Sequence, residues 1–313
     1  MNNNVSNIIE NIKKVIVGKE NTIEKVLICL ICKGNVLLED VPGVGKTTMV
    51  HTLAKSMDMT FKRIQFTPDL LPSDITGISI YNQKNGDFEF KKGPIFSNIV
   101  LADEINRTSP KTQSSLLEAM QENQITTDGN TLPLPSPFIV LATQNPIEYE
   151  GTFPLPEAQL DRFMMKISLG YPDKRSEKVI LRRFKEKNPL EEINSVLDTK
   201  DIIKMQREVK KVHVDESIDD YIIDIVSKTR EHEDINLGVS PRGSLALFKA
   251  SQGNAYIKGR NYVLPDDVKE LILPVLGHRI ILKPESKIQG NNSEKILKDI
   301  LRRIKVPVVK RND

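Results

Sequence analysis

A glycine-rich segment near the start of the chain limits its possible folds more than any other feature. It runs from Asp40 through Val-Pro-Gly-Val-Gly to Lys46 and directly follows a short apolar run that ends at Leu38. Glycines in such a loop let successive backbone N–H groups turn inward around phosphate oxygens, and the helix that follows directs its positive end at the same atoms. The segment therefore predicts a strand, a phosphate-binding loop and a helix, in that order.

The residues that close the loop indicate a nucleotide polyphosphate. The amine of Lys46 suits the β- and γ-phosphates, and the hydroxyl of Thr47 suits Mg²⁺. A dinucleotide-binding loop fits less well, because its third glycine would replace Thr48. The strict P-loop pattern has glycine where this chain has Asp40, and an ordinary glycine-rich turn is the remaining alternative. The residues predicted to contact the nucleotide here are Pro42, Gly43, Val44, Gly45, Lys46, Thr47 and Thr48.

The composition is that of an ordinary globular protein, with 28% charged and 39% hydrophobic residues. A chain of 313 residues can form one large or two modest domains. The net charge of +3 is too small to indicate nucleic-acid binding by itself. No apolar run approaches the roughly 20 residues that span a bilayer, and the asparagine-rich start does not resemble a secretory signal. We therefore expect no membrane insertion.

The two cysteines, Cys29 and Cys32, have the C-x-x-C spacing of some zinc and redox sites. They lie within an apolar stretch expected to be helical, and no second pair completes a zinc site. We therefore predict buried apolar thiols, which suit a reducing, cytoplasmic location.

Apolar runs and turn signals divide the chain into two parts. In the first part strands alternate with helices, which predicts an open, mostly parallel α/β sheet. Strands are expected at 35–38, 60–66, 98–102, 138–142 and 166–169, and helices at 22–33, 46–57 and 110–122. After Tyr171-Pro172 the pattern is helical, with helices expected at 174–188, 201–210, 215–231, 241–257 and 265–276. We predict a nucleotide-binding domain over residues 1–175, a linker over 176–200 and a smaller all-α domain over 201–313.

Two acidic residues follow the strand predicted at 98–102. Carboxylates at the C-terminal end of such a strand lie in the crevice where α/β folds bind ligands. We expect Asp103 to hold Mg²⁺ beside Thr47, and Glu104 to orient or deprotonate the attacking water. The next strand ends near Asn145, which we expect to position the same water beside the γ-phosphate. A solvated strand end for the acids, and a plain turn role before proline for Asn145, are the alternatives.

Several long motifs of this chain occur together in one known family. They are Leu-Glu-Asp-Val-Pro-Gly-Val-Gly-Lys-Thr (38–47), Ala-Asp-Glu-Ile-Asn-Arg (102–107), Lys-Thr-Gln-Ser-Ser-Leu-Leu-Glu-Ala-Met-Gln-Glu (111–122), Ala-Thr-Gln-Asn-Pro (142–146), Phe-Pro-Leu-Pro-Glu-Ala-Gln-Leu-Asp-Arg-Phe (153–163) and Val-Ser-Pro-Arg-Gly (239–243). With them the chain resembles the MoxR-type AAA+ ATPases over nearly its whole length. The resemblance implies an AAA+ P-loop NTPase core followed by a smaller all-α lid domain. Aspartate in place of the first loop glycine is common in that family.

The resemblance also implies roles for individual residues. Lys46-Thr47 belong to the Walker A motif, and Asp103 and Glu104 belong to Walker B. Asn145 is similar to sensor 1. Val17-Gly18 resembles the short segment that packs on adenine.

Two arginines complete the set that the resemblance implies. Arg162 matches the arginine finger, which reaches the γ-phosphate bound by a neighbouring subunit, and Arg242 matches sensor 2 at the start of a lid helix. A guanidinium suits this task because γ-phosphate cleavage develops charge on oxygens that it can contact in bidentate fashion. The alternatives are an ion pair of Arg162 with Asp161 or Glu157 within the chain, and an ordinary surface position for Arg242.

As a member of that family, the chain is expected to use ATP and Mg²⁺ as a homo-oligomeric, hexameric ring that remodels a protein client. A partner with a von Willebrand A domain is implied as well. The segment Thr67–Phe96 resembles the helix-2 insert of this branch and contains a hairpin expected over residues 78–90. Its aromatic residues, Tyr81, Phe88 and Phe90, either face the central pore or cover the edge of the sheet.

Three functions other than a protein-remodelling ATPase are alternatives. A magnesium-chelatase-like motor subunit shares the branch and remains open. A nucleic-acid motor would need a basic, aromatic-lined pore, but the hairpin carries Asp87 and Glu89 beside Lys84, so nucleic acid is not the expected partner. A non-hydrolysing scaffold would have lost Glu104, Asn145 or Arg162, and all three are present.

Overall fold

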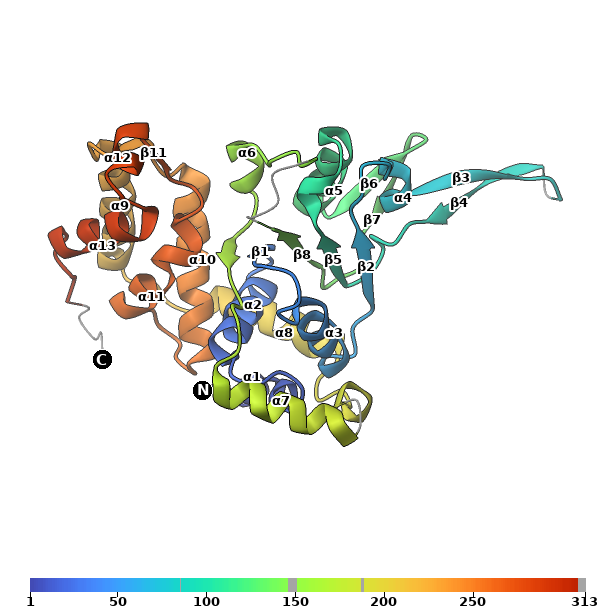
Figure 1. Cartoon of the computed structure of the whole chain (residues 1–313), viewed down its shortest axis with the longest axis horizontal. Coiled ribbons are helices and arrows are strands. Elements are labelled where there is room, and N and C mark those ends of the chain that lie inside the picture. The colour runs from blue at the N-terminus through green and yellow to red at the C-terminus, as the bar shows by residue number, and fades with distance from the viewer. Residues whose placement is uncertain (85, 146–150, 187–188, 309–313) are drawn as a thin grey trace.

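The computed structural model describes residues 1–84, 86–145, 151–186 and 189–308, and a five-stranded parallel sheet lies at its centre (Figure 1). The strands follow the order β2-β5-β8-β1-β9. Their bounds are β1 Val36–Glu39, β2 Phe61–Gln65, β5 Ile99–Asp103, β8 Ile139–Gln144 and β9 Met165–Ile167. The prediction of an open parallel α/β sheet is confirmed, and every predicted strand end lies within two residues of the observed one.

Helices cover both faces of the sheet, because successive strand residues point to opposite sides. Val36 and Leu38 belong to the hydrophobic core shared with α1 (Asn3–Lys13), α2 (Glu20–Ile31) and α3 (Lys46–Ser56). Leu37, between them, belongs to the core on the opposite face, with α5 (Pro110–Glu122). Helix α1 was not expected in a polar segment, but its few apolar residues recur at helical spacing and are buried: Val5, Ile8, Ile9 and Ile12.

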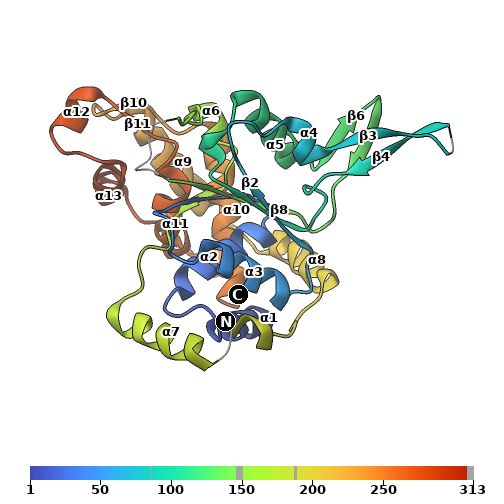
Figure 2. The same ribbon diagram turned by 45° about the vertical axis from the view of Figure 1, so that its right-hand side comes forward.

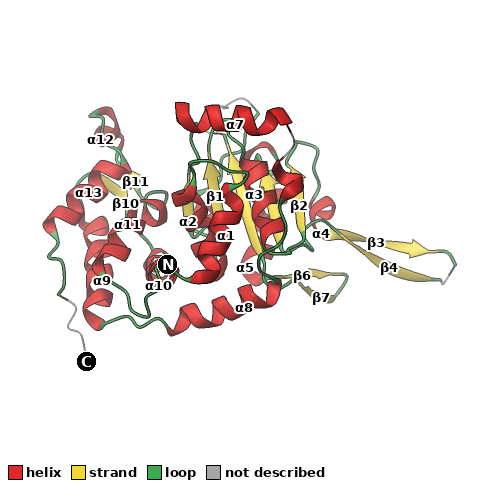
Figure 3. Cartoon of the chain, turned by 90° about the horizontal axis from the view of Figure 1, so that it is seen from below, coloured by secondary structure: helices red, strands yellow, loops and turns green. Residues whose placement is uncertain are grey.

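Two antiparallel hairpins extend from the core. The strands β3 (Gly77–Asn82) and β4 (Asp87–Lys92) form the longer hairpin, which projects from the body on the side away from the helical part (Figures 1 and 3). Tyr81 and Phe88 are 52% and 74% exposed, so these two rings do not cover the sheet edge, whereas Phe90 contacts Phe96 edge to face. The shorter hairpin joins β6 (Gln124–Thr127) to β7 (Asn130–Pro133). Short helices α4 (Pro72–Thr76) and α6 (Glu157–Leu160) lie between these elements.

The second part of the chain is mainly helical, as expected, and its portion from residue 216 onward lies beside the β9 edge of the sheet (Figure 2). Its helices are α7 Lys174–Glu186, α8 Thr199–Glu208, α9 Glu216–Glu231, α10 Pro241–Ile257, α11 Pro265–Leu276, α12 Pro284–Ile288 and α13 Ser293–Arg303. Helix α10 packs on α2, and α11 contacts β9. The sequence did not predict α12, α13 or the small β-ribbon of β10 (Ile235–Leu237) and β11 (Ile281–Leu282). The domain boundaries at 175 and 200 stay a prediction.

The two cysteines lie where α2 meets α10. Cys29 is fully buried, and the thiol of half-buried Cys32 donates to the carbonyl of Lys249 at 3.1 Å. Burial raises the pKa of Cys32 to about 12, which keeps the thiol protonated and unreactive. Within the described ranges, no helix is both long and apolar enough to cross a membrane.

Candidate active site

The loop between β1 and α3 contains two glycines in the left-handed region of backbone conformation. Gly43 and Gly45 have φ values of +82° and +90°, which side-chain-bearing residues rarely adopt. Apart from the glycine itself and its two chain neighbours, no atom lies within 4 Å of the position that a Cβ would take at either glycine. The amine of Lys46 donates to the carbonyls of Asp40 at 2.9 Å and Val41 at 3.2 Å. Its amine thus lies against the loop that is expected to hold the phosphates.

Asp40, which stands where the strict P-loop pattern has glycine, has a structural role. Its carboxylate is buried and joins the loop to the chain that leaves β9. One oxygen accepts from the hydroxyl of Ser168 at 2.6 Å and from the backbone N–H of Gly170 at 3.0 Å. The other accepts from the backbone N–H of Leu169 at 2.6 Å. Asp40 therefore fixes the position of residues 168–170 relative to the loop.

A cavity of about 450 Å³ adjoins the loop and is large enough for a nucleoside. The residues around it come from the N-terminal segment, the loop, the chain after β9 and α7: Val15, Ile16, Val17, Lys19, Gly43, Val44, Gly45, Thr48, Leu169, Tyr171, Pro172, Glu177, Ile180 and Leu181. Gly18 has a φ of +71°, and a Cβ there would lie 2.6 Å from the Ser176 hydroxyl oxygen. Glycine at this position therefore lets the first turn of α7 approach the predicted adenine segment.

The two predicted acids lie at the C-terminal end of β5. The carboxylate of Asp103 accepts from the hydroxyl of Thr143 at 2.6 Å and forms an ion pair with Arg63 at 2.5 Å. Glu104 has a φ of +58°, an uncommon conformation for a residue with a side chain. Its carboxylate accepts from Gln65 at 2.9 Å and from Arg107 at 3.1 Å.

The neighbours of these acids were not predicted from the sequence. Arg63 and Gln65 lie on β2, which pairs with β5, so that Gln65 is level with Asp103. The order of the strands is not readable from the chain, and the polar residues of β2 were the only signal available. These two side chains hold the acids of β5 in place, and Gln65 is in contact with the predicted water-activating residue.

Asn145 directly follows β8, the strand between β5 and β1, and is 8% exposed. Because all three strands are parallel, the loop, the acids and Asn145 lie at one edge of the sheet. Residue 146, the last of the predicted motif, falls outside the described residues. The structure therefore brings together Lys46, Thr47, Asp103, Glu104 and Asn145 at the C-terminal edge.

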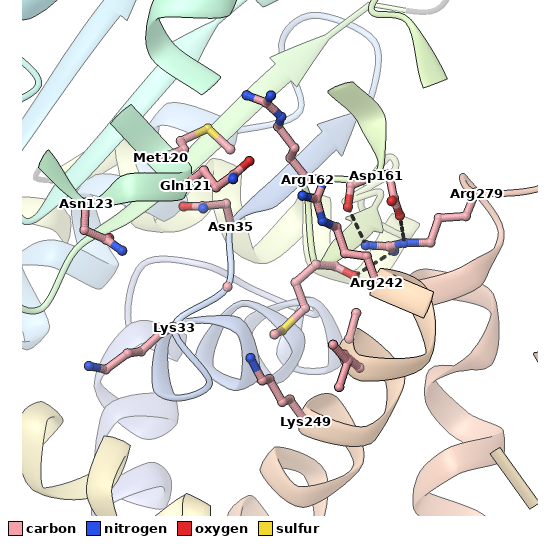
Figure 4. Close-up of a pocket in the computed structure, with 14 residues that line it drawn as sticks. Lys33, Asn35, Met120, Gln121, Asn123, Asp161, Arg162, Arg242, Lys249 and Arg279 are labelled. Carbon is pink, nitrogen blue, oxygen red and sulfur yellow. Dashed lines mark hydrogen bonds and ion pairs between the residues drawn. The ribbon is translucent and has the colours of Figure 1, made fainter. Parts of the chain in front are cut away.

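Arg162 and Arg242 lie elsewhere. Both line a cavity of about 320 Å³ between the sheet and α10, and no residue of the phosphate-binding loop lines it (Figure 4). The segment of Arg162 leads into β9 at the N-terminal edge of the sheet, where the N–H of Met164 donates to the carbonyl of Asn35 at 2.8 Å. From Asn35 to Asp40 the extended chain covers about 17 Å. The two arginines are thus separated from the loop of their own subunit.

The alternative ion pairs of Arg162 are not formed. Among the residues that the structure describes, no ion pair joins Arg162 to Asp161 or Glu157. Asp161 is instead 2.7 Å from the Nε of Arg279, and its other oxygen accepts from Ser240 at 2.9 Å. The carboxylate next to Arg162 is therefore already engaged.

Comparison with known proteins agrees with the fold and the loop. Residues 35–165 match the family described as the ATPase family associated with various cellular activities (AAA), and residues 227–300 match the AAA lid domain. A crystal structure from Cytophaga hutchinsonii superposes with a TM-score of 0.92 at 46% identity, covering 98% of this chain and 96% of that one. The fold and the loop thus define an ATPase of the AAA class.

Two relatives show which family of AAA ATPases the chain belongs to. The uncharacterized protein YeaC of Bacillus subtilis is 56% identical over 300 residues, which are 96% of this chain and 94% of that protein. The chaperone MoxR1 of Mycobacterium tuberculosis is 43% identical over 307 residues, or 95% of this chain and 81% of that protein. The chain therefore belongs to the MoxR family of AAA ATPases, as its motifs predicted.

Proposed function

We propose that this protein is a Mg²⁺-dependent ATPase that assembles into a hexameric ring, with each active site shared by two subunits. The observation that supports a shared site is the separation of Arg162 and Arg242 from the phosphate-binding loop of their own subunit. Lys46 and Glu104 lie at one edge of the sheet, and Arg162 and Arg242 line a cavity that begins at the other edge. In a ring built from head-to-tail contacts, the surface of one subunit that carries Lys46 and Glu104 can face the surface of the next subunit that carries the two arginines.

One subunit would hold the nucleotide. The loop N–H groups and Lys46 would bind the phosphates, and the cavity near Val17 would hold the base. Thr47 and Asp103 fit Mg²⁺, because a hydroxyl and a buried carboxylate are the oxygen donors that this ion prefers. When bound, Mg²⁺ would neutralise charge on the β- and γ-phosphates. Glu104, released from Gln65, would orient the attacking water together with Asn145.

The neighbouring subunit would supply both arginines. Arg162 and Arg242 line one cavity with Lys33 and Lys249, which makes this surface suited to an anion. Because Arg242 accompanies Arg162 and lies apart from its own loop, we infer that it also acts on the neighbour's γ-phosphate. Two guanidinium groups there would stabilise the charge that develops during cleavage.

The work done by hydrolysis is proposed by analogy with the family. One similar protein is named a chaperone, and we propose that this chain likewise remodels a protein client, together with a partner that has a von Willebrand A domain. The exposed β3–β4 hairpin, with Tyr81 and Phe88 free of the body, is the element that we expect to face the central pore and the client.

The test is the ATPase activity per subunit as a function of protein concentration. We expect activity to rise with assembly and Arg162→Ala to abolish it, whereas Arg302→Ala, on the exposed face of α13, keeps it. Mixing Arg162→Ala with Glu104→Gln restores about a quarter of the parent rate, because random mixing pairs an intact Glu104 with an intact Arg162 at that share of head-to-tail interfaces. Activity that is independent of concentration and survives Arg162→Ala would refute the shared site.

A further inference from the structure

We propose that Arg279 is a positioning residue for hydrolysis, which holds the segment of Arg162 and the helix of Arg242 together as one unit. This inference rests on the proposed shared site. It concerns a residue that no motif of the sequence singled out and that lies in the turn just after α11, far along the chain from Arg162.

The guanidinium of Arg279 binds the backbone on both sides of Arg162. It donates to the carboxylate of Asp161 at 2.7 Å and to the carbonyls of Asp161 at 3.1 Å, Phe163 at 2.6 Å and Met164 at 3.2 Å (Figure 4). Only 7% of Arg279 is exposed. The acceptors span residues 161–164, so the orientation of the segment that carries Arg162 depends on this one side chain.

Arg279 and Asp161 also contact the helical part at α11 and at the start of α10. Arg279 also donates to the carbonyl of Val275 in α11. The second oxygen of Asp161 accepts from the hydroxyl of Ser240 at 2.9 Å, and Ser240 is the N-cap of α10. Arg242 is the second residue of that helix. Asp161 and Arg279 thus link the segment of Arg162 to the helix start that carries Arg242.

The ion pair between Asp161 and Arg279 also affects the charge of the cavity that Arg162 and Arg242 line. Of the described residues that line it, five are basic and Asp161 alone is acidic. Because Arg279 engages Asp161, this carboxylate does not neutralise Arg162 or Arg242, which remain available for a phosphate. A buried guanidinium is costly unless it is paired, and its planar set of five donors satisfies a carboxylate and several carbonyls at once. A lysine has no such fork.

The experiment measures ATP hydrolysis by Arg279→Gln and Arg279→Lys. For both we expect kcat to fall about 10- to 100-fold, as for other mispositioned catalytic groups, because the subunit no longer presents its arginines to its neighbour. KM should stay within about twofold, since the variant's own nucleotide site is intact. The matched control is Arg260→Gln, which breaks another ion pair of the helical part, formed at 2.6 Å with the buried carboxylate of Asp267. This control is expected to lower the melting temperature and keep kcat.

Mixing each arginine variant with Lys46→Ala subunits distinguishes a loss of arginine positioning from a loss of the variant's own nucleotide site. Lys46→Ala subunits are expected to bind no nucleotide but to present intact arginines, so they should restore activity to both Arg279→Gln and Arg162→Ala. Rescue of Arg162→Ala without rescue of Arg279→Gln or Arg279→Lys would overturn the positioning role and leave the shared site standing. A kcat for both Arg279 variants within twofold of the parent would also overturn it. Failure to rescue Arg162→Ala would refute the shared site and, with it, this inference.

Discussion

Replacing Asp40 by alanine tests the structural role of the residue that departs from the P-loop pattern. The change removes three hydrogen bonds to a buried carboxylate and leaves the N–H groups of Leu169 and Gly170 without this acceptor. Each bond to a charged group contributes about 1.5–3 kcal/mol, so the lower end gives about 4–5 kcal/mol for the three. Asp40→Asn keeps one acceptor oxygen but turns an amide toward an N–H donor, and we expect it to cost about 2–3 kcal/mol.

The neighbouring carboxylate provides the control. Glu39 forms an ion pair with Lys166 at 2.8 Å, but both side chains are about a third exposed, and pairs of this kind contribute about 0–1 kcal/mol. It also accepts from Gln144, which adds about 1 kcal/mol. Glu39→Ala should therefore destabilise the protein far less than Asp40→Ala.

The assay is urea unfolding monitored by circular dichroism, with thermal unfolding beside it. For a domain of this size, 1 kcal/mol shifts the melting temperature by about 2–4 °C, so Asp40→Ala should lower it by about 8–20 °C. ATP affinity should fall as well, because Leu169 lines the cavity that we propose holds the base. If Asp40→Ala is no less stable than Glu39→Ala, the assigned role of Asp40 is wrong.

Further predictions concern the nucleotide site and the pH dependence of stability. Lys46→Ala should lose binding of a fluorescent ATP analogue, and unchanged affinity would contradict its assignment. Glu104→Gln should bind ATP but hydrolyse it about 10²–10⁴-fold more slowly, which single-turnover rates would measure; the parent rate would exclude Glu104 as the water-activating residue. Burial lowers the pKa of His278 well below its usual value, so the unfolded chain binds the proton more readily. Its contribution to stability is constant above about pH 6.5 and falls by about 1.4 kcal/mol per pH unit below it. In His278→Gln the free energy of unfolding should therefore change less with pH between pH 7 and 5.5. An unchanged pH dependence would refute the assigned effect of His278.

The sequence alone determined the central sheet, the phosphate-binding loop and the position of the acids. These features are encoded locally: continuous apolar runs form buried parallel strands, and residues that directly follow them lie at the C-terminal edge. The tight loop needs positive φ values, which glycine adopts readily, so its glycines mark it without reference to the rest of the chain. Asp103, Glu104 and Asn145 could therefore be assigned to one edge before any contact was known. The family resemblance, rather than local pattern, supplied Arg162 and Arg242.

Only the tertiary structure decided which side chains meet. Arg279 contacts Asp161 across 118 positions of the chain, and Asp40 contacts Leu169 across 129. Such contacts depend on strand order and on how α10 and α11 pack, and neither leaves a periodic signal in the sequence. The same holds for Gln65 beside Glu104, which results from the pairing of β2 with β5. Local pattern thus fixed where each group lies on its own element, while packing between distant elements decided that the two arginines line a cavity apart from their own loop.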